Sequence, residues 1–162
     1  PDEITIYALK KAKEHKCLTI LNPAPARKID EDNFKLIDFF TPNETEAEFY
    51  LNKNIKTDTD IKNAANEFLK KGIKNVIITL GEKGIYFANR EENFFLEAYK
   101  LKQAVIDTTG AGDAFNGAFA VGLANDFDIK DALSFANKVA GISTTRLGAA
   151  SSMPFAKELE NN

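Results

Sequence analysis

The feature that most constrains the fold is a glycine-rich stretch late in the chain, Asp-Thr-Thr-Gly-Ala-Gly-Asp-Ala-Phe at residues 107–115. Gly110, Ala111 and Gly112 predict a turn without bulky side chains, and from Ala114 the apolar residues recur at helical spacing. A glycine turn that leads into a helix gathers free backbone N–H groups at the positive end of the helix dipole. This arrangement predicts an anion site, and phosphate is the usual ligand of such sites.

Asp113 adds a chemical group to this turn, because it falls in the first turn of the predicted helix. A site that binds phosphate through N–H groups does not need a carboxylate, which would repel the phosphate. A carboxylate at this position is suited instead to accept a proton from a hydroxyl that attacks phosphorus. The alternative is a helix-start carboxylate stabilised by the dipole, which explains the acid but not the two glycines beside it. We therefore predict that Asp113 is a catalytic base.

The composition narrows the class of protein. At 162 residues and 44% apolar content the chain is long enough for one core, which predicts a single domain. The net charge of −3 gives no basic face, so we expect no nucleic acid partner. One cysteine and one histidine provide neither an intrachain disulfide nor a zinc site. No apolar run is long enough for a bilayer and no signal peptide is found, so we expect no membrane partner and a cytoplasmic location.

The beginning of the chain carries its own prediction. Pro1-Asp2-Glu3 leads directly into an amphipathic helix predicted over residues 4–16, with Ile4, Tyr7 and Ala8 at helical spacing. A chain that starts on a helix and then supplies strand after strand is interpreted as the later part of a longer protein.

Strands and helices alternate along the rest of the chain. Because helices separate most of the strands, we expect a three-layer αβα fold with a mostly parallel sheet, and the short turn at residues 81–84 predicts antiparallel strands at one side. The predicted strands are residues 17–21, 36–40, 75–80, 85–88, 94–101 and 104–106, and the later helices are 59–71, 114–125 and 128–145.

Two further segments have both a structural and a functional interpretation. Asn43 and Glu46 have the spacing of a capping box at a helix start, and capping alone would account for them. A cap at the carboxyl end of a strand also faces the crevice in which α/β proteins bind ligands. Gly81 and Gly84 bound a turn between two strands, which a hairpin alone would explain.

Residues 107–115 resemble the C-terminal signature of the ribokinase-like carbohydrate kinases, in which the Gly-Ala-Gly turn is the anion hole and the final Asp is the catalytic base. Asn-Pro-Ala-Pro-Ala-Arg at 22–27 and Thr-Pro-Asn-Glu-Thr-Glu-Ala-Glu at 41–48 are similar to segments of the ribokinase branch of that family. By itself, the segment 22–27 is better explained as a strand-to-helix loop. A P-loop does not fit, because no Lys-Ser/Thr pair follows these glycines, and a dinucleotide turn does not fit, because Phe115 occupies the third glycine position.

The resemblance covers residues 4–154 and implies roles for single residues. It implies ATP as a substrate and cofactors Mg²⁺ and K⁺, the potassium ion held by oxygen atoms, as suits a hard cation. It links Asn43 and Glu46 indirectly to magnesium, and it places K⁺ near Asp107, Thr109, Ser143, Arg146, Gly148 and Ser152. The nucleotide residues that it implies are Asn43, Thr79, Leu80, Gly81, Glu82, Lys83, Gly84, Gly112, Asp113 and Asn137.

The implied activity is ATP-dependent phosphorylation of D-ribose at O5, with Asp113 as the base and also a contact of the sugar. The chain would then be the C-terminal part, residues 1–162, of a single ribokinase-like domain. The first part of such a domain carries a lid, through which family members dimerise, and most of the sugar pocket. We expect residues 1–162 alone to bind nucleotide weakly and to turn over little. The alternatives are a family kinase for fructose, a nucleoside or a vitamin alcohol, and a nucleotide-binding module without turnover.

Overall fold

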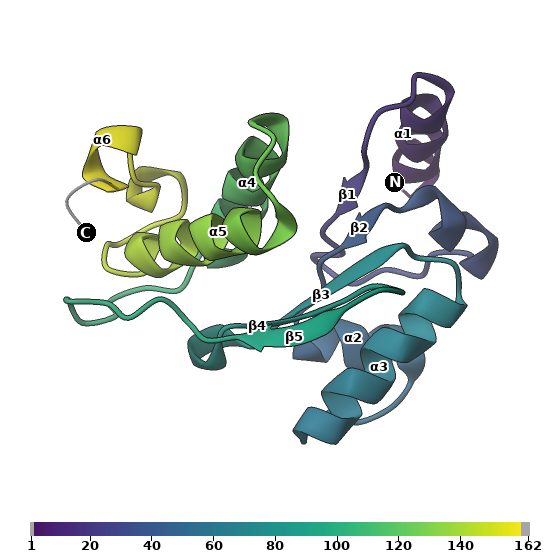
Figure 1. Ribbon diagram of the computed structural model, residues 1–162, viewed down its shortest axis with the longest axis horizontal. Helices are drawn as coiled ribbons and strands as arrows, with labels where there is room; N and C mark the ends of the chain where they lie inside the picture. Colours follow the sequence, from purple (N-terminus) through teal and green to yellow (C-terminus); the bar gives the residue numbers. More distant parts are fainter. Residues whose placement is uncertain (1, 160–162) are drawn as a thin grey trace. The chain divides into compact units, whose positions relative to one another are not determined.

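The structure is a computed structural model that describes residues 2–159. The chain divides into two compact units, drawn in Figure 1. Unit 1 comprises Pro1–Gly81 and Ile85–Leu96, and unit 2 comprises Glu82–Gly84 and Glu97–Asn162.

Unit 1 is built on a five-stranded sheet whose strands follow one another in chain order. The pairs β1–β2 and β2–β3 are parallel, and the pairs β3–β4 and β4–β5 are antiparallel. The expected combination of parallel strands with antiparallel strands at one side is therefore confirmed. The strands are β1 (Ile20–Leu21), β2 (Phe39–Phe40), β3 (Asn75–Thr79), β4 (Ile85–Ala88) and β5 (Asn93–Leu96).

Two helices, α2 (Glu44–Leu51) and α3 (Asp58–Lys70), pack against this sheet, and Figure 1 shows them on the same face of it. Both begin with a capping box, one from Asn43 and the other from Thr57. Between helices and sheet lies an apolar core with several side chains fully excluded from solvent, among them Phe40, Phe68, Val76 and Ile78 at 0% exposure.

The first two strands are shorter than the sequence pattern predicts. Of residues 17–21 only Ile20 and Leu21 pair in the sheet, and Leu18 is 65% exposed. Of residues 36–40 only Phe39 and Phe40 pair, because the chain before them forms the short helix η1 (Glu31–Leu36), capped by Asp30. Apolar runs of five residues locate these strands correctly but do not tell a strand from the turn that enters it.

Helix α1 (Asp2–Glu14) packs against η1 and ends two residues earlier than expected, before Lys16 adopts a left-handed conformation with φ 57°. The apolar stripe that the spacing indicated does not face the core of unit 1. Ile4 is 62% exposed and Tyr7 is 63% exposed, whereas Leu9 is the buried residue of the helix at 7%. The helix is confirmed, and its solvent-facing apolar side chains are a finding of the structure.

A buried carboxylate, Asp38, joins three segments of unit 1. Its side chain is 4% exposed, and it pairs with Lys13 of α1 and, at 2.7 Å, with Lys74, which precedes β3. Its Oδ2 atom also accepts hydrogen bonds from the backbone N–H and the hydroxyl of Thr19, at 2.9 and 3.1 Å. Burial raises the pKa of Asp38, but the hydrogen bonds from Lys13, Lys74 and Thr19 lower it overall, from 3.8 to about 2.

Unit 2 is built around the helices α4 (Ala111–Ala124) and α5 (Ile129–Ser143). They pack closely at Gly122, where an added Cβ atom would lie 3.0 Å from the Cβ atom of Ala132. The stripe predicted for α4 is buried, with Phe115 at 3% and Phe119 at 0% exposure. The short helices η3 (Ala150–Ser152) and α6 (Ala156–Leu159) follow.

The strand expected at 94–101 forms only in its first residues, as β5, which ends at Leu96. The strand expected at 104–106 does not form, and Val105 and Ile106 are 57% and 59% exposed. Instead of joining a ladder, the N–H groups of Ile106 and Asp107 both donate to the carbonyl oxygen of Thr144, at 2.8 and 3.1 Å. An apolar pair before a turn was misread as a strand because its backbone partner is the distant end of α5.

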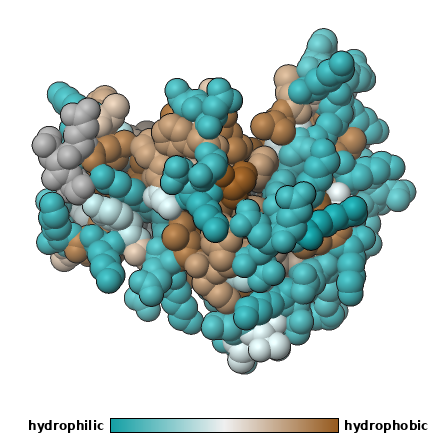
Figure 2. Space-filling model, viewed as in Figure 1, coloured by the Kyte–Doolittle hydropathy of each residue, from teal (hydrophilic) through white to brown (hydrophobic). Residues whose placement is uncertain are grey.

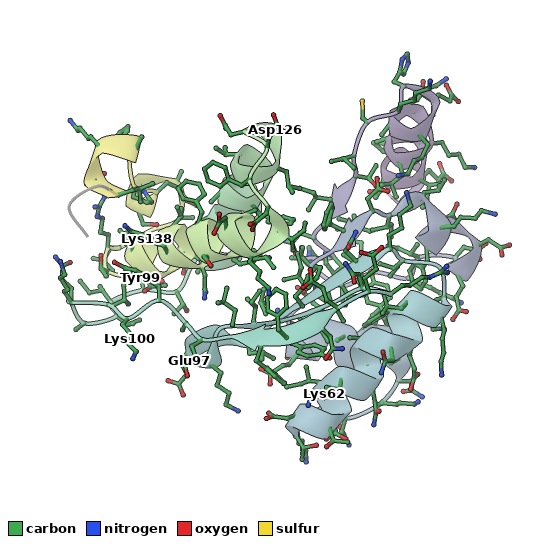
Figure 3. All side chains as sticks on the ribbon, viewed as in Figure 1. Lys62, Glu97, Tyr99, Lys100, Asp126 and Lys138 are labelled. Carbon is green, nitrogen blue, oxygen red and sulfur yellow. The ribbon has the colours of Figure 1, made fainter. Side chains whose placement is uncertain are left out.

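Polar side chains reinforce both units at their surfaces. In unit 2 the Nζ atom of Lys138 lies 5.6 Å from the ring centroid of Tyr99, and both residues are labelled in Figure 3. In unit 1 the Nζ atom of Lys62 lies 5.6 Å from the ring centroid of Phe95 on β5. Within residues 2–159, the helices are all too short or too polar to cross a membrane.

The Asp38 cluster predicts a specific pH dependence of stability. Because the pKa of Asp38 is lower in the folded protein than its ordinary 3.8, the cluster stabilises the fold above about pH 4 and loses this effect as the pH falls towards 2. The shift corresponds to about 2 kcal/mol of unfolding free energy. We expect Asp38→Asn to remove this contribution at pH 7 and to flatten the pH dependence between 4 and 2, as measured by urea denaturation.

The control is Asp32→Asn, because Asp32 is an exposed carboxylate of η1. This variant should change the unfolding free energy by less than about 0.5 kcal/mol and keep the pH dependence of the parent protein. Equal pH profiles for Asp38→Asn and the parent would contradict the role of the cluster.

Candidate functional site

The N-terminus of α4 lacks the side-chain cap that other helices of this chain have. Gly110 occupies the N-cap position with φ 79° and makes no side-chain cap, whereas Asn43, Thr57 and Asp128 cap α2, α3 and α5. The N–H of Ala111 donates to the Thr108 carbonyl oxygen at 3.1 Å. The next N–H groups, of Gly112 and Asp113, lie at the positive end of the helix dipole with no side chain capping them. This is the geometry of an anion site.

Gly110 is required at this position for two physical reasons. Its φ of 79° is disfavoured for residues with a Cβ atom. An added Cβ atom would also lie 3.0 Å from the Cβ atom and 3.1 Å from the Cα atom of Ala149. At Gly112, by contrast, an added Cβ atom would meet nothing within 4 Å, so the space in front of this residue is open. The first glycine shapes the turn, and the second leaves room beside the free N–H groups.

Asp113 is the third residue of α4 and its side chain is exposed, as the sequence predicted for a residue of the first helical turn. Within residues 2–159, neither a hydrogen bond nor an ion pair engages its carboxylate. The neighbouring Asn116 donates to the Gly112 carbonyl oxygen at 2.8 Å and so stiffens the same helical turn. Asp113 is therefore free to accept a proton or a hydroxyl hydrogen bond from a ligand at the turn.

Asp107 fastens the start of the turn to the chain that follows α5. Its Oδ1 atom accepts from the Thr109 N–H, and its Oδ2 atom accepts from the Gly148 N–H, both at 2.9 Å. Hydrogen bonds from the Thr109 side chain and from the N–H groups of Gly148 and Thr109 lower the pKa of Asp107 below its ordinary value. Of the six residues expected near K⁺, the structure thus brings Asp107, Thr109 and Gly148 into direct contact.

Of the remaining residues of that set, Ser143 is the last residue of α5, and Arg146 and Ser152 lie on the segment after it. Ser143 and Ser152 are buried, at 1% and 0% exposure, and their hydroxyls donate to the carbonyl oxygens of Ala140 and Ala149. The guanidinium of Arg146 pairs with Glu158 at 2.7 Å, so only the backbone of Arg146 is available for a cation. All three supply oxygen atoms and none supplies sulfur or imidazole, which is the ligand type that a hard cation prefers.

In unit 1, Asn43 and Glu46 form the capping box that their spacing predicted. The Asn43 side chain accepts from the Glu46 N–H, and Glu46 Oε2 accepts from the Asn43 N–H, both at 2.8 Å. Asn43 is bridged to Thr79 at the end of β3, and the Thr79 N–H donates to the Pro42 carbonyl oxygen at 2.9 Å. Three of the predicted ligand residues of unit 1 therefore meet at the carboxyl end of the parallel strands, where α/β proteins bind ligands.

The connection from β3 to β4 is the expected tight turn. Residues Gly81–Lys83 form one turn of 3₁₀ helix, and Gly81 and Gly84 have φ values of 58° and 95° that favour glycine. Leu80 and Gly84 are buried, whereas Gly81, Glu82 and Lys83 are exposed. An exposed turn beside the buried Leu80 is suited to contact a ligand through its main chain.

Asn137 lies within α5, where its Nδ2 atom donates to the Glu97 carbonyl oxygen at 2.6 Å. This bond ties α5 to the segment after β5. Its role in nucleotide binding, which the resemblance implies, remains a prediction.

Several residues that shape the turn carry no local sequence signal. Ala149 and Met153 pack against Gly110, and the Thr144 carbonyl oxygen anchors the approach to the turn. These partners lie roughly 40 residues from the turn in the sequence, so no periodicity or motif reveals them.

Comparison with known proteins identifies the family of this chain. Residues 2–156 match the pfkB family of carbohydrate kinases. This chain belongs to that family.

The chain spans about half the length of the curated relatives that it matches. It is 42% identical over 160 residues to a ribokinase of Staphylococcus aureus, a match that covers 98% of this chain and 52% of the relative. It is 37% identical over 153 residues to a deoxyribokinase of Salmonella typhi, covering 94% of this chain and 49% of the relative.

A solved structure of Arabidopsis thaliana ribokinase, complexed with ribose and ATP, matches with a TM-score of 0.92 at 32% identity. The match covers 99% of this chain and 52% of that structure. The three-layer ribokinase-like α/β fold expected from the sequence, present here as part of that fold, is therefore shown.

The steric environment of Gly110 leads to a paired prediction on α4. Gly110→Ala should lower the unfolding free energy by about 1–3 kcal/mol, because it combines a strained φ with a contact at 3.0 Å. Gly117→Ala should raise the unfolding free energy by about 0.5–1 kcal/mol, because Gly117 lies inside the helix and an added Cβ atom meets nothing within 4 Å. Chemical denaturation measures both. A Gly110→Ala variant as stable as Gly117→Ala would show that the turn can adopt another conformation.

Proposed function

We propose that this chain is the ATP-binding and catalytic part of a kinase that phosphorylates the 5-hydroxyl of ribose. The observation that carries the proposal is the uncapped N-terminus of α4, with open space at Gly112 and the unengaged carboxylate of Asp113 in its first turn. Family membership supports the reaction class, and the ribose and ATP bound to the Arabidopsis relative support this pair of substrates.

The turn supplies electrostatic stabilisation of the transferred phosphoryl group. Phosphoryl transfer passes through a loose transition state whose charge is spread over the equatorial oxygens. N–H groups fixed by a helix need no reorganisation as that charge develops, and loss of one such donor costs about 10²–10³-fold in turnover at comparable sites. The N–H groups of Gly112 and Asp113 fill this role in the proposal, with Gly110 and Ala111 holding the turn.

Asp113 receives the proton of the attacking hydroxyl. In a loose transition state the proton leaves late, so a carboxylate that orients the hydroxyl is sufficient. The negative charge of Asp113 is compatible with an anion site because its own helix dipole stabilises it. The same carboxylate would hold the sugar by a hydrogen bond before transfer.

ATP would lie along residues 79–84 and Asn43, and Asn137 would lie close to the adenine base of ATP. The solved structure of the Arabidopsis relative is complexed with ATP. The exposed turn at Gly81, Glu82 and Lys83 offers backbone groups to the phosphates. Phosphates favour such fixed N–H groups.

The donor groups fit the two proposed metal ions. One carboxylate oxygen of Glu46 is used by the capping box, which leaves Oε1 for a water bound to Mg²⁺ and makes an indirect role consistent with the geometry. Mg²⁺ would neutralise the phosphates. K⁺ would be held by backbone and hydroxyl oxygens between Asp107 and Ser152, where this chain supplies only oxygen ligands.

The alcohol that accepts the phosphoryl group is the part of the proposal that rests on the fewest observations. One relative is a ribokinase and another is a deoxyribokinase, so the 2-hydroxyl is the group on which related proteins differ. We expect the whole protein to use ribose best in a coupled assay against 2-deoxyribose, fructose, nucleosides and vitamin alcohols. A higher kcat/KM for any other acceptor would replace ribose in the proposal, and ATP binding without turnover on every acceptor would favour a nucleotide-binding module.

Substitution of Asp113 separates catalysis from nucleotide binding. In the whole protein, Asp113→Ala should lower kcat by about 10²–10⁴-fold, because the attacking hydroxyl loses its base, and should change the affinity for ATP only slightly. Asp126→Asn is the control, since Asp126 is an exposed carboxylate just after α4 (Figure 3) with φ 58°, a conformation that asparagine tolerates. Steady-state kinetics and calorimetry with ATP measure both effects, and an unchanged kcat for Asp113→Ala would remove this residue from the mechanism.

A further inference from the structure

Three residues between α5 and α6 touch the glycine turn or the carboxylate that leads into it. The Gly148 N–H donates to Asp107 Oδ2 at 2.9 Å. Ala149 packs against Gly110, and the Met153 Cε atom lies 3.5 Å from the position that a Cβ atom of Gly110 would take. The segment that carries these contacts contains only the short helix η3 as regular structure. Its conformation therefore depends on contacts made by its side chains.

An ion pair joins the two ends of this segment. The Nη2 atom of Arg146 lies 2.7 Å from Glu158 Oε1, and the Nη1 atom lies 3.5 Å from Oε2. The two partners are 12 residues apart in the sequence, so the pair closes a loop. Gly148, Ala149 and Met153 all lie within this loop. Because a closed loop has fewer conformations than an open one, the ion pair restrains all three contacts to the turn.

Helix α6 is held in place by polar contacts. Within the described range, which ends at Leu159, α6 buries none of its residues, and Phe155 just before it is 71% exposed. Figure 2 shows apolar surface over α4, but α6 buries no side chain of its own against such a surface. Instead Glu158 Oε2 accepts from the Phe155 N–H at 2.7 Å, and Lys138 of α5 donates to the Leu159 carbonyl oxygen at 2.6 Å. Glu158 therefore both starts α6 and holds Arg146.

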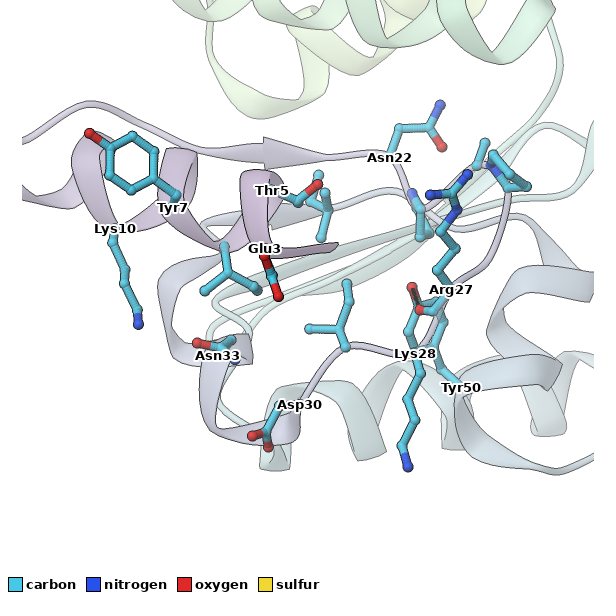
Figure 4. Close-up of a pocket in the computed structure, with 16 residues that line it drawn as sticks. Glu3, Thr5, Tyr7, Lys10, Asn22, Arg27, Lys28, Asp30, Asn33 and Tyr50 are labelled. Atoms are coloured by element: carbon cyan, nitrogen blue, oxygen red, sulfur yellow. Dashed lines mark hydrogen bonds between the residues drawn. The ribbon is translucent and has the colours of Figure 1, made fainter. Parts of the chain in front are cut away.

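The other two arginines of the chain are not fixed in this way. Arg27 lines a groove of unit 1 that is shown in Figure 4, and Arg90 is exposed after β4. Among residues 2–159, neither of these guanidinium groups makes a hydrogen bond or an ion pair. The guanidinium of Arg146, by contrast, directs two nitrogens at the two oxygens of one carboxylate. Such an arrangement fixes orientation as well as distance.

We propose that Glu158 is a positioning residue for phosphoryl transfer, which through Arg146 holds the segment that fixes the Gly110 turn. The inference rests on the function proposed above. The side chains of Arg146 and Glu158 are 36% and 30% exposed, and ion pairs of this kind add little to global stability. The effect of the pair is therefore expected in the geometry of the turn and in turnover, since a misplacement of about 1 Å at a reacting centre can cost about 100-fold.

Amide hydrogen exchange in residues 1–162 tests the positioning directly. The Gly148 N–H reports the contact with the turn, and the Ala111 N–H, which donates within the turn, reports the turn itself. Both amides should exchange about three- to fivefold faster in Glu158→Gln and in Arg146→Gln, because the loop is then open. The amide of Ala118, inside α4, should keep its rate, which shows that the change is local.

Glu67→Gln is the matched control. The Glu67 carboxylate pairs with Lys53 at 2.5 Å and its side chain is 33% exposed, but it lies on α3 in unit 1. This variant should change neither reporter amide by more than about 1.5-fold. Arg146→Lys, which keeps the charge, replaces Arg146→Gln should that variant lose its far-ultraviolet circular dichroism spectrum. Equal exchange rates in Glu158→Gln and Glu67→Gln would overturn the proposal.

Steady-state kinetics of the whole protein relate the positioning to the reaction. Glu158→Gln and Arg146→Gln should each lower kcat about five- to tenfold and change the KM for ATP less than about twofold, because the turn acts mainly on charge that develops in the transition state. A variant with both substitutions should be no slower than the slower single variant, because the two changes break the same contact. Multiplied effects on kcat, or an unchanged kcat, would contradict the proposal.

The two measurements distinguish a failure of this inference from a failure of the proposed function. Faster exchange of the Gly148 and Ala111 amides, in a whole protein that phosphorylates none of the acceptors, supports the role of Glu158 in holding the turn and counts against the proposed function. Exchange rates that Glu158→Gln leaves unchanged, in a protein that phosphorylates ribose, count against Glu158 alone.

Discussion

The position of the glycine turn depends on one carboxylate. Asp107 holds the Thr109 N–H and the Gly148 N–H on its two oxygens, so the approach to α4 and the segment after α5 cannot move independently. The lowered pKa of Asp107 shows that these hydrogen bonds favour the charged form. With the approach fixed, Ala149 can pack against Gly110, and the left-handed conformation at Gly110 directs the following N–H groups outwards. The geometry of the proposed anion site is thus a consequence of contacts made about 40 residues away in the sequence.

The absence of a side-chain cap lowers the stability of α4 but leaves its first N–H groups available for the proposed binding of phosphate. A side-chain cap contributes about 1 kcal/mol, and α2, α3 and α5 each have one. At α4 a cap would occupy the N–H groups that a phosphate needs. The apolar packing of Phe115 and Phe119, together with the close approach of α4 to α5 at Gly122, stabilises the helix without a cap. The free N–H groups therefore belong to a rigid element, as electrostatic stabilisation of a transition state requires.

Local features of this protein could be predicted from the sequence, and contacts between distant segments could not. The turn at Gly110, the capping box of Asn43 and Glu46 and the hairpin at 81–84 each depend on a few adjacent residues, and each is confirmed. The approach to α4 was predicted as a strand, because an apolar pair alone does not show that its partner is the Thr144 carbonyl oxygen. The spacing of Ile4, Tyr7 and Ala8 predicts an apolar side of α1, but helical spacing does not show whether that side packs against the core or faces solvent. The Asp38 cluster likewise joins residues with no common motif.

The exposed position of Asp113 sets a requirement for the proposed chemistry. A carboxylate that activates a sugar hydroxyl beside free N–H groups would activate water equally well if water occupied the same place. A sugar kinase therefore needs surfaces that exclude water and hold the acceptor, and in this chain the space at Gly112 and the side chain of Asp113 are open. Relatives about twice as long have as much chain again with which to supply such surfaces.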